Sequence, residues 1–448
     1  MTEGVAALAG ALERGEISSE DATRASLARI EARDGALRTF IRVMREEALA
    51  AARESDERRR GGASKGALDG VPIAVKDNID VAGVPTTGGI AHYRENVARE
   101  DAFVIRRLRD AGAVILGKVN MHEAALGATG DNPWFGRCEN PHRVGYTPGG
   151  SSSGSGAAVA AGLVAAALGT DTLGSVRVPA SYCGTAGFKP TYGLVSTRGV
   201  IPLSWTLDHV GFLAPGVADL GLLFDACAGF DRDWAYARRG PRFLSPKRAD
   251  PTNLAGVRIG QPATDAGLEP EVAAAWERAI AALAGLGATI VPIALAGYDF
   301  SRMRREGLLV SEIEGATFHK DALERDPERF SAALRELLAF GAKQTAIRAA
   351  QAYRRLADVR VIARRAFAGT DALVLPTTPQ AAFPFAQPVP VDQADLTGLA
   401  NIVGIPAGCV PFGRNGGGLP LSVQVVAPAF EDRLALDLLA ALESAAPA

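Results

Sequence analysis

Residues 70–78, GVPIAVKDN, open the stretch of sequence that decides the fold. They set Lys76 at the end of a run of apolar residues, which is the pattern of a buried strand. Two Gly-rich segments follow along the chain, PGGSSSGSG at residues 148–156 and GTDTLGSVRVP at residues 169–179. A lysine in an apolar strand and serines in two separate turns are the groups that a serine hydrolase with a lysine base requires.

Strands and helices alternate around these three segments. Strands are predicted at residues 71–75 and 113–116, with a helix near residues 103–111 between them and an apolar helix at residues 157–168. Alternation of this kind predicts an α/β sheet with helices on its faces. Further along, the pattern predicts strands at residues 257–260, 289–292, 372–375, 405–412 and 419–426, a helix with Val272, Trp276, Ile280 and Leu283 on one face, and a final helix at about residues 431–444.

The ends of the chain have a different composition from its middle. Residues 1–60 are predicted to be helical, with Ser18 and Asp21 as a capping box and Leu27 and Ile30 on one face. Residues 300–366 are rich in charge and in helix formers, which indicates several helices that could cover the core as a lid. No long linker interrupts the chain, so we expect one domain. Its expected parts are an N-terminal helical layer (1–65), a core (66–228), the lid-like segment (300–366) and a C-terminal part of the core (367–448).

Composition limits the classes of function. The chain has 448 residues, 48% of them hydrophobic and 22% charged, which predicts a globular protein with a large core. A net charge of −2 gives no reason to expect nucleic acid or an anionic membrane as a partner, so a small molecule is expected instead. The apolar run at residues 157–169 is shorter than the roughly 20 residues that span a bilayer. The N-terminus lacks the basic region of a secretory signal.

The cysteines form no metal or disulfide pattern. They are far apart and make no CxxC pair, which argues against a structural zinc site or a disulfide framework and favours the cytoplasm. The four are Cys138, Cys183, Cys227 and Cys409.

The loop at residues 148–156 has three interpretations. Gly149 and Gly154 have the separation of a phosphate-binding loop, but Ser155 and Gly156 stand where that motif needs Lys followed by Ser or Thr. A flexible linker would not run straight into an apolar helix. In a catalytic loop, glycines would let the backbone approach a ligand, and the helix N-terminus would favour a developing negative charge. From the residues alone, a structural turn is as good an interpretation as the catalytic loop.

Several ordered motifs resemble the amidase signature family, serine hydrolases that act on C–N bonds of amides. They are GVPIAVKDN, PGGSSSGSGAAVAAGL and LGTDTLGSVRVPA followed by CGTAGFKPTYG. The resemblance begins at about residue 66 and extends to NIVGIPAGCVPFG and GLPLSVQ within residues 401–424. It implies the α/β fold of that family, in which helices cover both faces of a large twisted mixed sheet.

The resemblance also implies a role for each matching residue. Lys76 matches the catalytic lysine, Ser151 the bridging serine that sits on a cis peptide bond, and Ser175 the nucleophile. Gly127, Ala128 and Thr129 match a segment that lines the acyl pocket, although a tight packing turn explains those residues equally well. The oxyanion hole maps onto the backbone N–H groups of Thr172, Leu173, Gly174 and Ser175, and support of this loop onto Asp171 and Arg177.

Two positions depart from the family pattern. Leu173 stands where most members have glycine; its N–H group remains, but a side chain is added beside the acyl site. Ser153 replaces a glycine that is frequent in the bridging loop, a feature similar to the allophanate hydrolase branch. We expect Leu173 to change the shape of the pocket.

The chemistry of Lys76 fits the role of a base under one condition. A lysine with its ordinary pKa of about 10.4 is protonated at neutral pH, so burial beside Ile73 and Val75 would have to lower that pKa. Our hypothesis is that neutral Lys76 takes a proton from Ser151, Ser151 takes one from Ser175, and Ser175 attacks the carbonyl.

Histidine offers a weaker alternative. His209 follows Asp208, but adjacent residues of an extended chain point to opposite sides and do not easily form the Asp–His pair of a Ser-His-Asp triad. The other histidines show no HExxH motif or paired spacing, so neither a metal nor another cofactor is expected. They are His92, His122, His142 and His319.

Three hypotheses of function follow. The first is a hydrolase of small amides, with carbamates (urethanes) as related substrates, acting as a monomer or homodimer on a small-molecule substrate. The second is the amidase component of a glutamine-dependent tRNA amidotransferase, which would need a partner protein; allophanate hydrolase-like activity is a related alternative. The third is a scaffold that kept the fold without catalysis, which the presence of Lys76, Ser151 and Ser175 disfavours.

Overall fold

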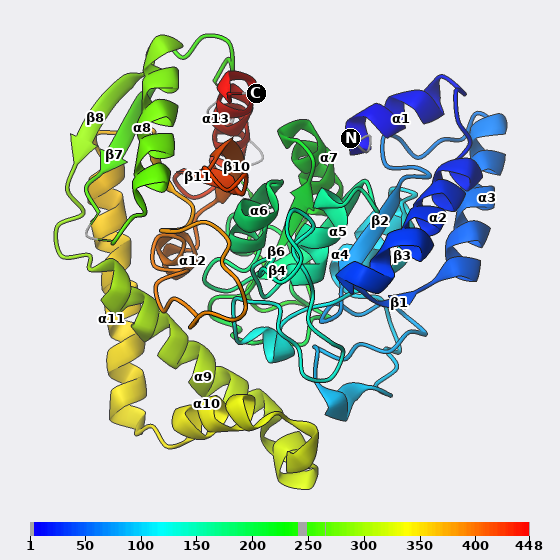
Figure 1. Cartoon of the computed structure of the whole chain (residues 1–448), viewed down its shortest axis with the longest axis horizontal. Helices are drawn as coiled ribbons and strands as arrows, with labels where there is room; N and C mark the ends of the chain where they lie inside the picture. The colour runs from blue at the N-terminus through cyan, green and yellow to red at the C-terminus, as the bar shows by residue number, and fades with distance from the viewer. Residues whose placement is uncertain (1–3, 241–248, 265, 448) are drawn as a thin grey trace.

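One sheet of eleven strands forms the centre of the molecule (Figure 1). The computed structural model describes residues 4–240, 249–264 and 266–447. From edge to edge the strands are β1 (Phe40–Val43), β3 (Val114–Val119), β2 (Pro72–Lys76), β4 (Ala166–Asp171), β6 (His209–Ala214), β5 (Ala186–Lys189), β10 (Ala407–Arg414), β11 (Pro420–Val426), β9 (Ala372–Pro376), β7 (Arg258–Pro262) and β8 (Thr289–Ile293).

The sheet mixes parallel and antiparallel pairs. β2 is parallel to both of its neighbours, β3 and β4, and β7 is parallel to β8 and β9. Between these groups the strands are antiparallel, and β10 joins the two halves by pairing with β5. The C-terminal part of the chain therefore lies directly beside the segment that holds the Gly-rich motifs. The mixed sheet that the sequence predicts is confirmed.

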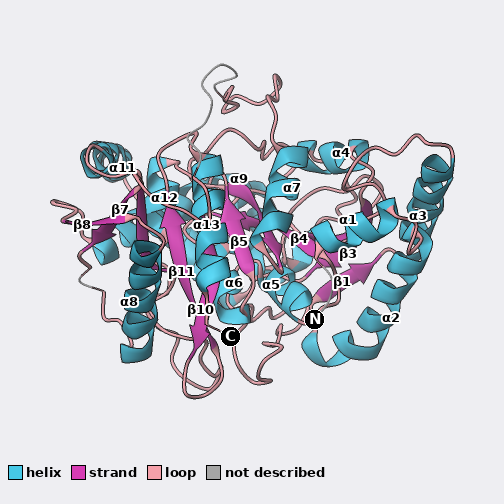
Figure 2. Cartoon of the chain, turned by 90° about the horizontal axis from the view of Figure 1, so that it is seen from above, coloured by secondary structure: helices cyan, strands magenta, loops and turns pink. Residues whose placement is uncertain are grey.

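Helices cover both faces of the sheet (Figure 2). In β2, Ile73 and Val75 pack into the core on one face, whereas Ala74 packs into the core on the other. Because side chains alternate along a strand, a strand buried on both faces is apolar throughout. The first face is covered by α1 (Val5–Glu13), α4 (Phe103–Asp110), α7 (Val217–Cys227), α8 (Pro270–Gly285) and α13 (Asp432–Ala445), and the second by α2 (Ser19–Leu37), α3 (Arg45–Arg60), α5 (Ser153–Ala160) and α6 (Arg177–Cys183).

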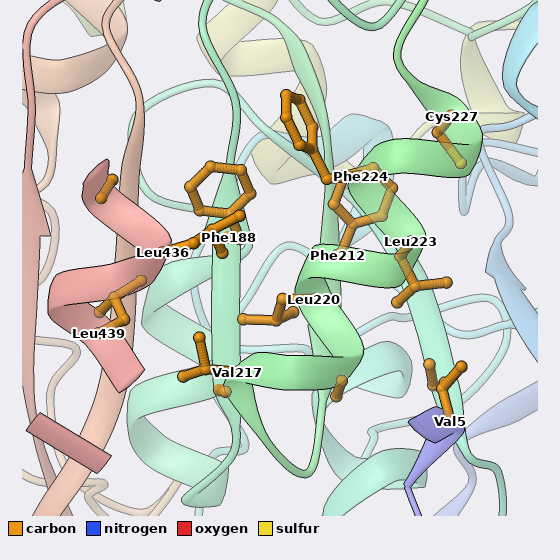
Figure 3. Packing of buried hydrophobic residues seen from close by; sticks show 14 of the residues in the cluster. Val5, Phe188, Phe212, Val217, Leu220, Leu223, Phe224, Cys227, Leu436 and Leu439 are labelled. Carbon is orange, nitrogen blue, oxygen red and sulfur yellow. The ribbon is translucent and has the colours of Figure 1, made fainter. Parts of the chain in front are cut away.

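Aromatic side chains fill the core on the first face (Figure 3). Phe188 of β5 and Phe212 of β6 are directly opposite each other in the sheet, and both are fully buried. The ring of Phe188 meets that of Phe224 of α7 edge-to-face, with ring centroids 5.6 Å apart. Leu220 of α7 and Leu439 of α13 lie beside these rings. This packing fixes α7 and α13 over the middle of the sheet.

The N-terminal layer is helical as predicted, with one exception. Ser18 caps α2 by accepting a hydrogen bond from the Asp21 N–H at 3.0 Å, which confirms the predicted helix start. Residues 40–43 are not helical but form β1, which pairs with the edge of β3. Arg38 ends α2 in the left-handed conformation. The segment that follows contains the β-branched Ile41 and Val43, and it pairs with β3 through Phe40, Arg42 and Val43, a pairing that helical periodicity does not reveal. Residues 1–3 lie outside the described part of the chain.

The predicted helix at residues 157–168 is wrong in its second half. α5 ends at Ala160, Gly162 turns the chain with a φ of 71°, and β4 begins at Ala166. Both parts are apolar because both are buried, so their composition is the same. Periodicity alone does not separate a buried helix from a buried strand.

Three helices occupy the segment of residues 300–366, namely α9 (Phe300–Arg325), α10 (Ala332–Ala342) and α11 (Ala346–Phe367) (Figure 1). The short helix α12 (Gly398–Val403) packs between α11 and the sheet, and the remaining predicted strands and helices are found within a few residues of their expected bounds. In the described ranges, no helix combines the length and the apolar character needed to cross a bilayer.

Phe212→Ala tests the importance of the aromatic core. We expect the free energy of unfolding to fall by about 3–5 kcal/mol, because the change leaves a cavity between β6 and α7. Phe340→Ala is the matched control, since Phe340 is 53% exposed and its loss should change that free energy by less than about 0.5 kcal/mol. Urea unfolding followed by circular dichroism measures both, and equal midpoints for the two variants would contradict the packing described here.

Candidate active site

Lys76 is the last residue of β2 and lies at the carboxyl end of the parallel strands β2 and β4. Its side chain is fully buried. Lys76 Nζ lies 2.7 Å from Ser151 Oγ and donates to Thr170 Oγ1 at 2.8 Å. The side chain of Asn78 donates to the same Thr170 hydroxyl at 3.1 Å. The structure thus brings Lys76 and Ser151, which are 75 residues apart in sequence, into direct contact.

Burial controls the protonation of Lys76. Removal from water lowers the pKa of Lys76 to about 7, although the carboxylates of Asp208 and Asp171 act in the opposite direction. Desolvation disfavours a charged ammonium, which explains the sign of this shift. A substantial fraction of Lys76 is therefore neutral at physiological pH.

The loop before α5 holds Ser151. The peptide bond between Gly150 and Ser151 is cis. Gly150 packs closely against the wall of the site, because an added Cβ would lie 3.0 Å from backbone atoms of Ala128 and Thr129. The Ser152 N–H donates to the carbonyl of Ser175 at 3.2 Å. This hydrogen bond joins the Ser151 loop to the Ser175 loop.

Ser175 lies in the turn between β4 and α6, and backbone geometry shapes this turn. Gly174 has a φ of 137°, and a Cβ at this position would lie 2.2 Å from Thr397 Oγ1, so a larger residue would not fit. The Gly174 N–H donates to Asp171 Oδ1 at 2.7 Å. Among the described residues, no acceptor pairs with the N–H groups of Thr172, Leu173 and Ser175. These three groups are free to bind an anionic oxygen, whereas that of Gly174 is already engaged.

A buried ion pair supports the same turn. The Arg177 guanidinium donates to both oxygens of Asp171 at 3.1 Å, and neither side chain contacts water. Burial by itself would raise the pKa of Asp171, but the adjacent Arg177 outweighs burial and holds that pKa well below its ordinary range. Asp171 therefore stays ionised and accepts from the backbone of the turn.

The C-terminal part of the chain completes this support. Arg177 also donates to Asn401 Oδ1 at 2.6 Å and to Gln424 Oε1 at 3.0 Å. Asn401 Nδ2 donates back to the Asp171 carbonyl at 2.8 Å. The structure thus places Asp171 and Arg177 against the turn, and the pair joins α12 and β11 to it.

A cavity of about 400 Å³ opens beside Ser175. Its only charged lining residue in the described ranges is Arg304, whose guanidinium is paired with Asp395. The other walls are mostly apolar and come from α9, α10 and several loops. They include Leu126, Leu203, Leu308, Leu337, Val389 and Val391.

Leu173 and Gly307 are complementary in this cavity. Leu173 lines the cavity, and its side chain packs against α9 at Gly307, where an added Cβ would lie only 2.9 Å from Leu173 Cδ2. The leucine that departs from the family pattern is therefore accommodated by a glycine on the facing helix. It narrows the cavity on the side of α9.

The segment at residues 127–129 only partly lines the cavity. Gly127 and Ala128 are in its wall. Thr129 lies behind them, with its hydroxyl 3.3 Å from His122 Nδ1 and its carbonyl accepting from Thr147 at 2.7 Å. Thr129 is turned away because these two polar contacts hold it in the layer below the wall, so its expected substrate contact is not seen.

The histidine alternative has no geometric support. His209 Nδ1 lies 2.7 Å from the carbonyl of Leu207, and Asp208 instead accepts from the Thr172 hydroxyl at 2.6 Å. Burial lowers the pKa of His209 well below its ordinary value, so this ring is neutral. Within the described ranges, no three His, Cys, Asp or Glu side chains form a group that could hold a metal ion.

The sequence analysis missed Thr170 and the contacts of Asp208. Thr170 lies inside the motif at residues 169–179 and at the carboxyl end of the strand next to β2, which is the one available signal for its contact with Lys76. The sequence suggests Asp208 only as a partner of His209. The contact of Asp208 with Thr172 follows from the register of β4 and β6, which the sequence does not reveal.

Comparisons with known proteins identify the family of this chain. A family model described as amidase matches residues 21–436. A component of the glutamyl-tRNA(Gln) amidotransferase of Chloroflexus aurantiacus is 38% identical, with 96% of this chain and 93% of that protein covered. A solved chain from a vestigial complex linked to the origins of an s-triazine catabolic enzyme has a TM-score of 0.91 at 32% identity and 98% coverage of both chains.

A peptide amidase from Stenotrophomonas maltophilia has the same fold, with a TM-score of 0.87 at 31% identity over 98% of this chain and 96% of that chain. Both the amidase match and these relatives extend over nearly the whole sequence. The chain belongs to the amidase family, as the signature motifs around Lys76, Ser151 and Ser175 indicate.

Proposed function

We propose that this chain hydrolyses the C–N bond of small amides through a covalent acyl-enzyme on Ser175, with Ser151 as the proton relay and neutral Lys76 as the base. The observation that carries the proposal is the 2.7 Å contact between Lys76 Nζ and Ser151 Oγ, both of which belong to fully buried side chains. A hydrogen-bonded base within reach of a serine hydroxyl is the arrangement that activates a nucleophile.

Acylation begins with two proton transfers. Lys76 accepts the proton of Ser151, Ser151 accepts that of Ser175, and Ser175 Oγ bonds to the carbonyl carbon. The carbonyl oxygen becomes an oxyanion, which the free N–H groups of Thr172, Leu173 and Ser175 can stabilise by about 3–4 kcal/mol per donor. Gly174 is not among these donors, because its N–H is bound to Asp171.

Breakdown reverses the relay. Ser151 delivers a proton to the leaving nitrogen as the C–N bond breaks, and the released amine departs. Water then attacks the ester on Ser175, its proton passes to Lys76 through Ser151, and Ser175 recovers a proton as the carboxylic acid leaves. Each of these steps uses a side chain or backbone group of the site.

The cavity favours substrates with an uncharged apolar group. Leucine, valine, alanine and proline side chains form most of its wall, and Arg304 is neutralised by Asp395. A charged substrate group would lose its hydration without gaining an unpaired partner among these described residues. We therefore expect amides, and carbamates that present a similar carbonyl, with apolar substituents of moderate size.

A second candidate function rests on the names of the relatives. Curated relatives with 38% identity are components of glutamyl-tRNA(Gln) amidotransferases, so this chain could release ammonia from glutamine as one part of a larger assembly. The chemistry at Ser175 would be the same. The two functions differ in substrate, since glutamine carries two charges and the described wall of the cavity is mostly apolar.

Serine substitutions test the catalytic roles. Ser175→Ala should lower kcat/KM for an aryl amide by roughly 10⁴-fold or more, and Ser151→Ala by roughly 10²-fold or more, because each removes a step of the relay. Ser153→Ala is the matched control: Ser153 begins α5 two residues after Ser151, but its buried hydroxyl makes no hydrogen bond to the described residues. Wild-type turnover by Ser175→Ala, measured by product release, would rule out the mechanism.

The pH dependence tests the state of Lys76. Burial places the pKa of Lys76 near 7, and only the neutral amine is a base, so kcat/KM should rise with pH with a midpoint of about 7. Lys189 must be excluded as the origin of this midpoint, because burial also lowers its pKa to about 7. Its Nζ donates to the Ile405 carbonyl at 2.7 Å. Lys189→Met should keep the midpoint near 7, whereas Lys76→Ala should remove the activity. If the midpoint disappeared from the pH profile of Lys189→Met, its assignment to Lys76 would be contradicted.

Leu173→Gly tests whether the Leu173 side chain limits the size of the acyl group that the cavity accepts. The change removes the side chain that packs on Gly307, so kcat/KM for amides with a bulkier acyl group should rise roughly tenfold relative to small ones. Gly307→Ala, which would press on Leu173, should shift the preference the other way. A panel of matched apolar amides, carbamates and glutamine measures these ratios, and hydrolysis of glutamine alone would favour the second candidate function.

A further inference from the structure

We propose that Asp208 is a positioning residue: it fixes the turn at residues 172–175, called here the oxyanion turn, to Leu203 of the cavity wall and to its neighbour Ser204. This inference rests on the proposed function, because it assigns Asp208 to the machinery of Ser175. The sequence alone considers Asp208 only as a partner of His209, a pairing that it disfavours.

The sheet places Asp208 beside the oxyanion turn. β4 and β6 are antiparallel, and Asp171, the last residue of β4, is opposite His209, the first residue of β6. The next residue of each strand end, Thr172 and Asp208, therefore meet just beyond the sheet. Their side chains are in contact there, with the Thr172 hydroxyl donating to Asp208 Oδ1 at 2.6 Å.

The second oxygen of Asp208 holds the wall of the cavity. Asp208 Oδ2 accepts from the N–H groups of Leu203 and Ser204 at 2.9 and 3.0 Å. Leu203 lines the cavity beside Ser175, and Asp208 is only 4% exposed. One buried carboxylate thus joins a residue of the oxyanion turn to a residue that faces the substrate.

Glu314 extends this connection to the covering helices. Glu314 of α9 is fully buried and accepts from the Ser204 hydroxyl at 2.6 Å and from the Tyr353 hydroxyl of α11 at 2.7 Å. The donors that the structure shows around Asp208 and Glu314 are neutral hydroxyl and N–H groups. Ser204, which follows the lining residue Leu203, is therefore held between the two carboxylates.

The charge of Asp208 also acts on Lys76. Burial raises the pKa of Asp208 to about 6, against the effect of its hydrogen bonds, so the carboxylate is ionised in the pH range where Lys76 is neutral. Its negative charge favours the proton that Lys76 takes up during attack by Ser175. The charged groups that act with it are Lys76 and Asp171 at the strand ends and Glu314 on α9; the neutral phenol of Tyr192 is also within its field.

The test measures how fast a fluorophosphonate labels Ser175 in the full chain between pH 5 and 9. Labelling forms the Ser175 Oγ–P bond as the P–F bond breaks, fluoride leaves, and the proton passes through Ser151 to Lys76. Asp208→Asn should label roughly tenfold more slowly at pH 8, because the turn loses its anchor. The midpoint of its pH profile should fall, because Lys76 loses a neighbouring negative charge and its pKa decreases.

Two further variants separate position from charge. Thr172→Val removes the hydrogen bond but keeps the carboxylate, so labelling should slow without a change in midpoint. Asp231→Asn is the control, since Asp231 is also a buried, hydrogen-bonded aspartate, but its partners are Ser196 and Arg198. It should leave the rate and midpoint unchanged.

Wild-type rate and midpoint in folded Asp208→Asn would overturn the inference. If that variant does not fold, a wild-type labelling rate in Thr172→Val would overturn it as well. Absence of Ser175 labelling in the wild-type chain would instead overturn the proposed function, and this inference with it.

Discussion

The removal of Lys76 from water is the constraint on which the rest of the site depends. A buried ammonium is unfavourable unless it is compensated, so burial lowers the pKa of this side chain to about 7. The position follows from the sheet, because Lys76 ends β2 between two parallel strands that exclude solvent. Ser151 and Thr170 supply the polar contacts that such a group needs. Burial thus favours the neutral amine near pH 7, which the proposed role of Lys76 as a base requires.

The two Gly-rich turns need rigid support to stay beside this lysine. The Asp171–Arg177 ion pair provides this support by fixing the turn that holds Ser175. Asn401 and Gln424 hold the ion pair through hydrogen bonds to Arg177. Breaking a buried ion pair on one side leaves an unpaired charge and is strongly destabilising. The C-terminal segments are therefore part of the site although they line little of the cavity. This explains why family motifs are spread from the first strands to the end of the chain.

The sequence is most informative where its patterns are local. Short apolar runs identify most strands, and motif order predicts Lys76, Ser151 and Ser175 as the catalytic residues. The strand at residues 40–43 and the turn inside residues 157–168 could not be predicted, since pairing and burial decide them. The engaged N–H of Gly174 and the contacts of Asp208 depend on strand register and backbone direction. The cavity walls come from helices whose spacing carries no recognisable motif.

The most direct test of the account is the protonation of Lys76 itself. In a chain with lysines labelled with ¹³C at Cε, the chemical shift of Lys76 can be followed by NMR as the pH rises, with Lys76→Arg assigning the signal and Lys189→Met identifying the second low-pKa lysine. The account predicts a titration midpoint near 7 for Lys76. A midpoint near the ordinary lysine value of about 10.4 would mean that Lys76 stays charged at neutral pH, and would contradict its role as the base.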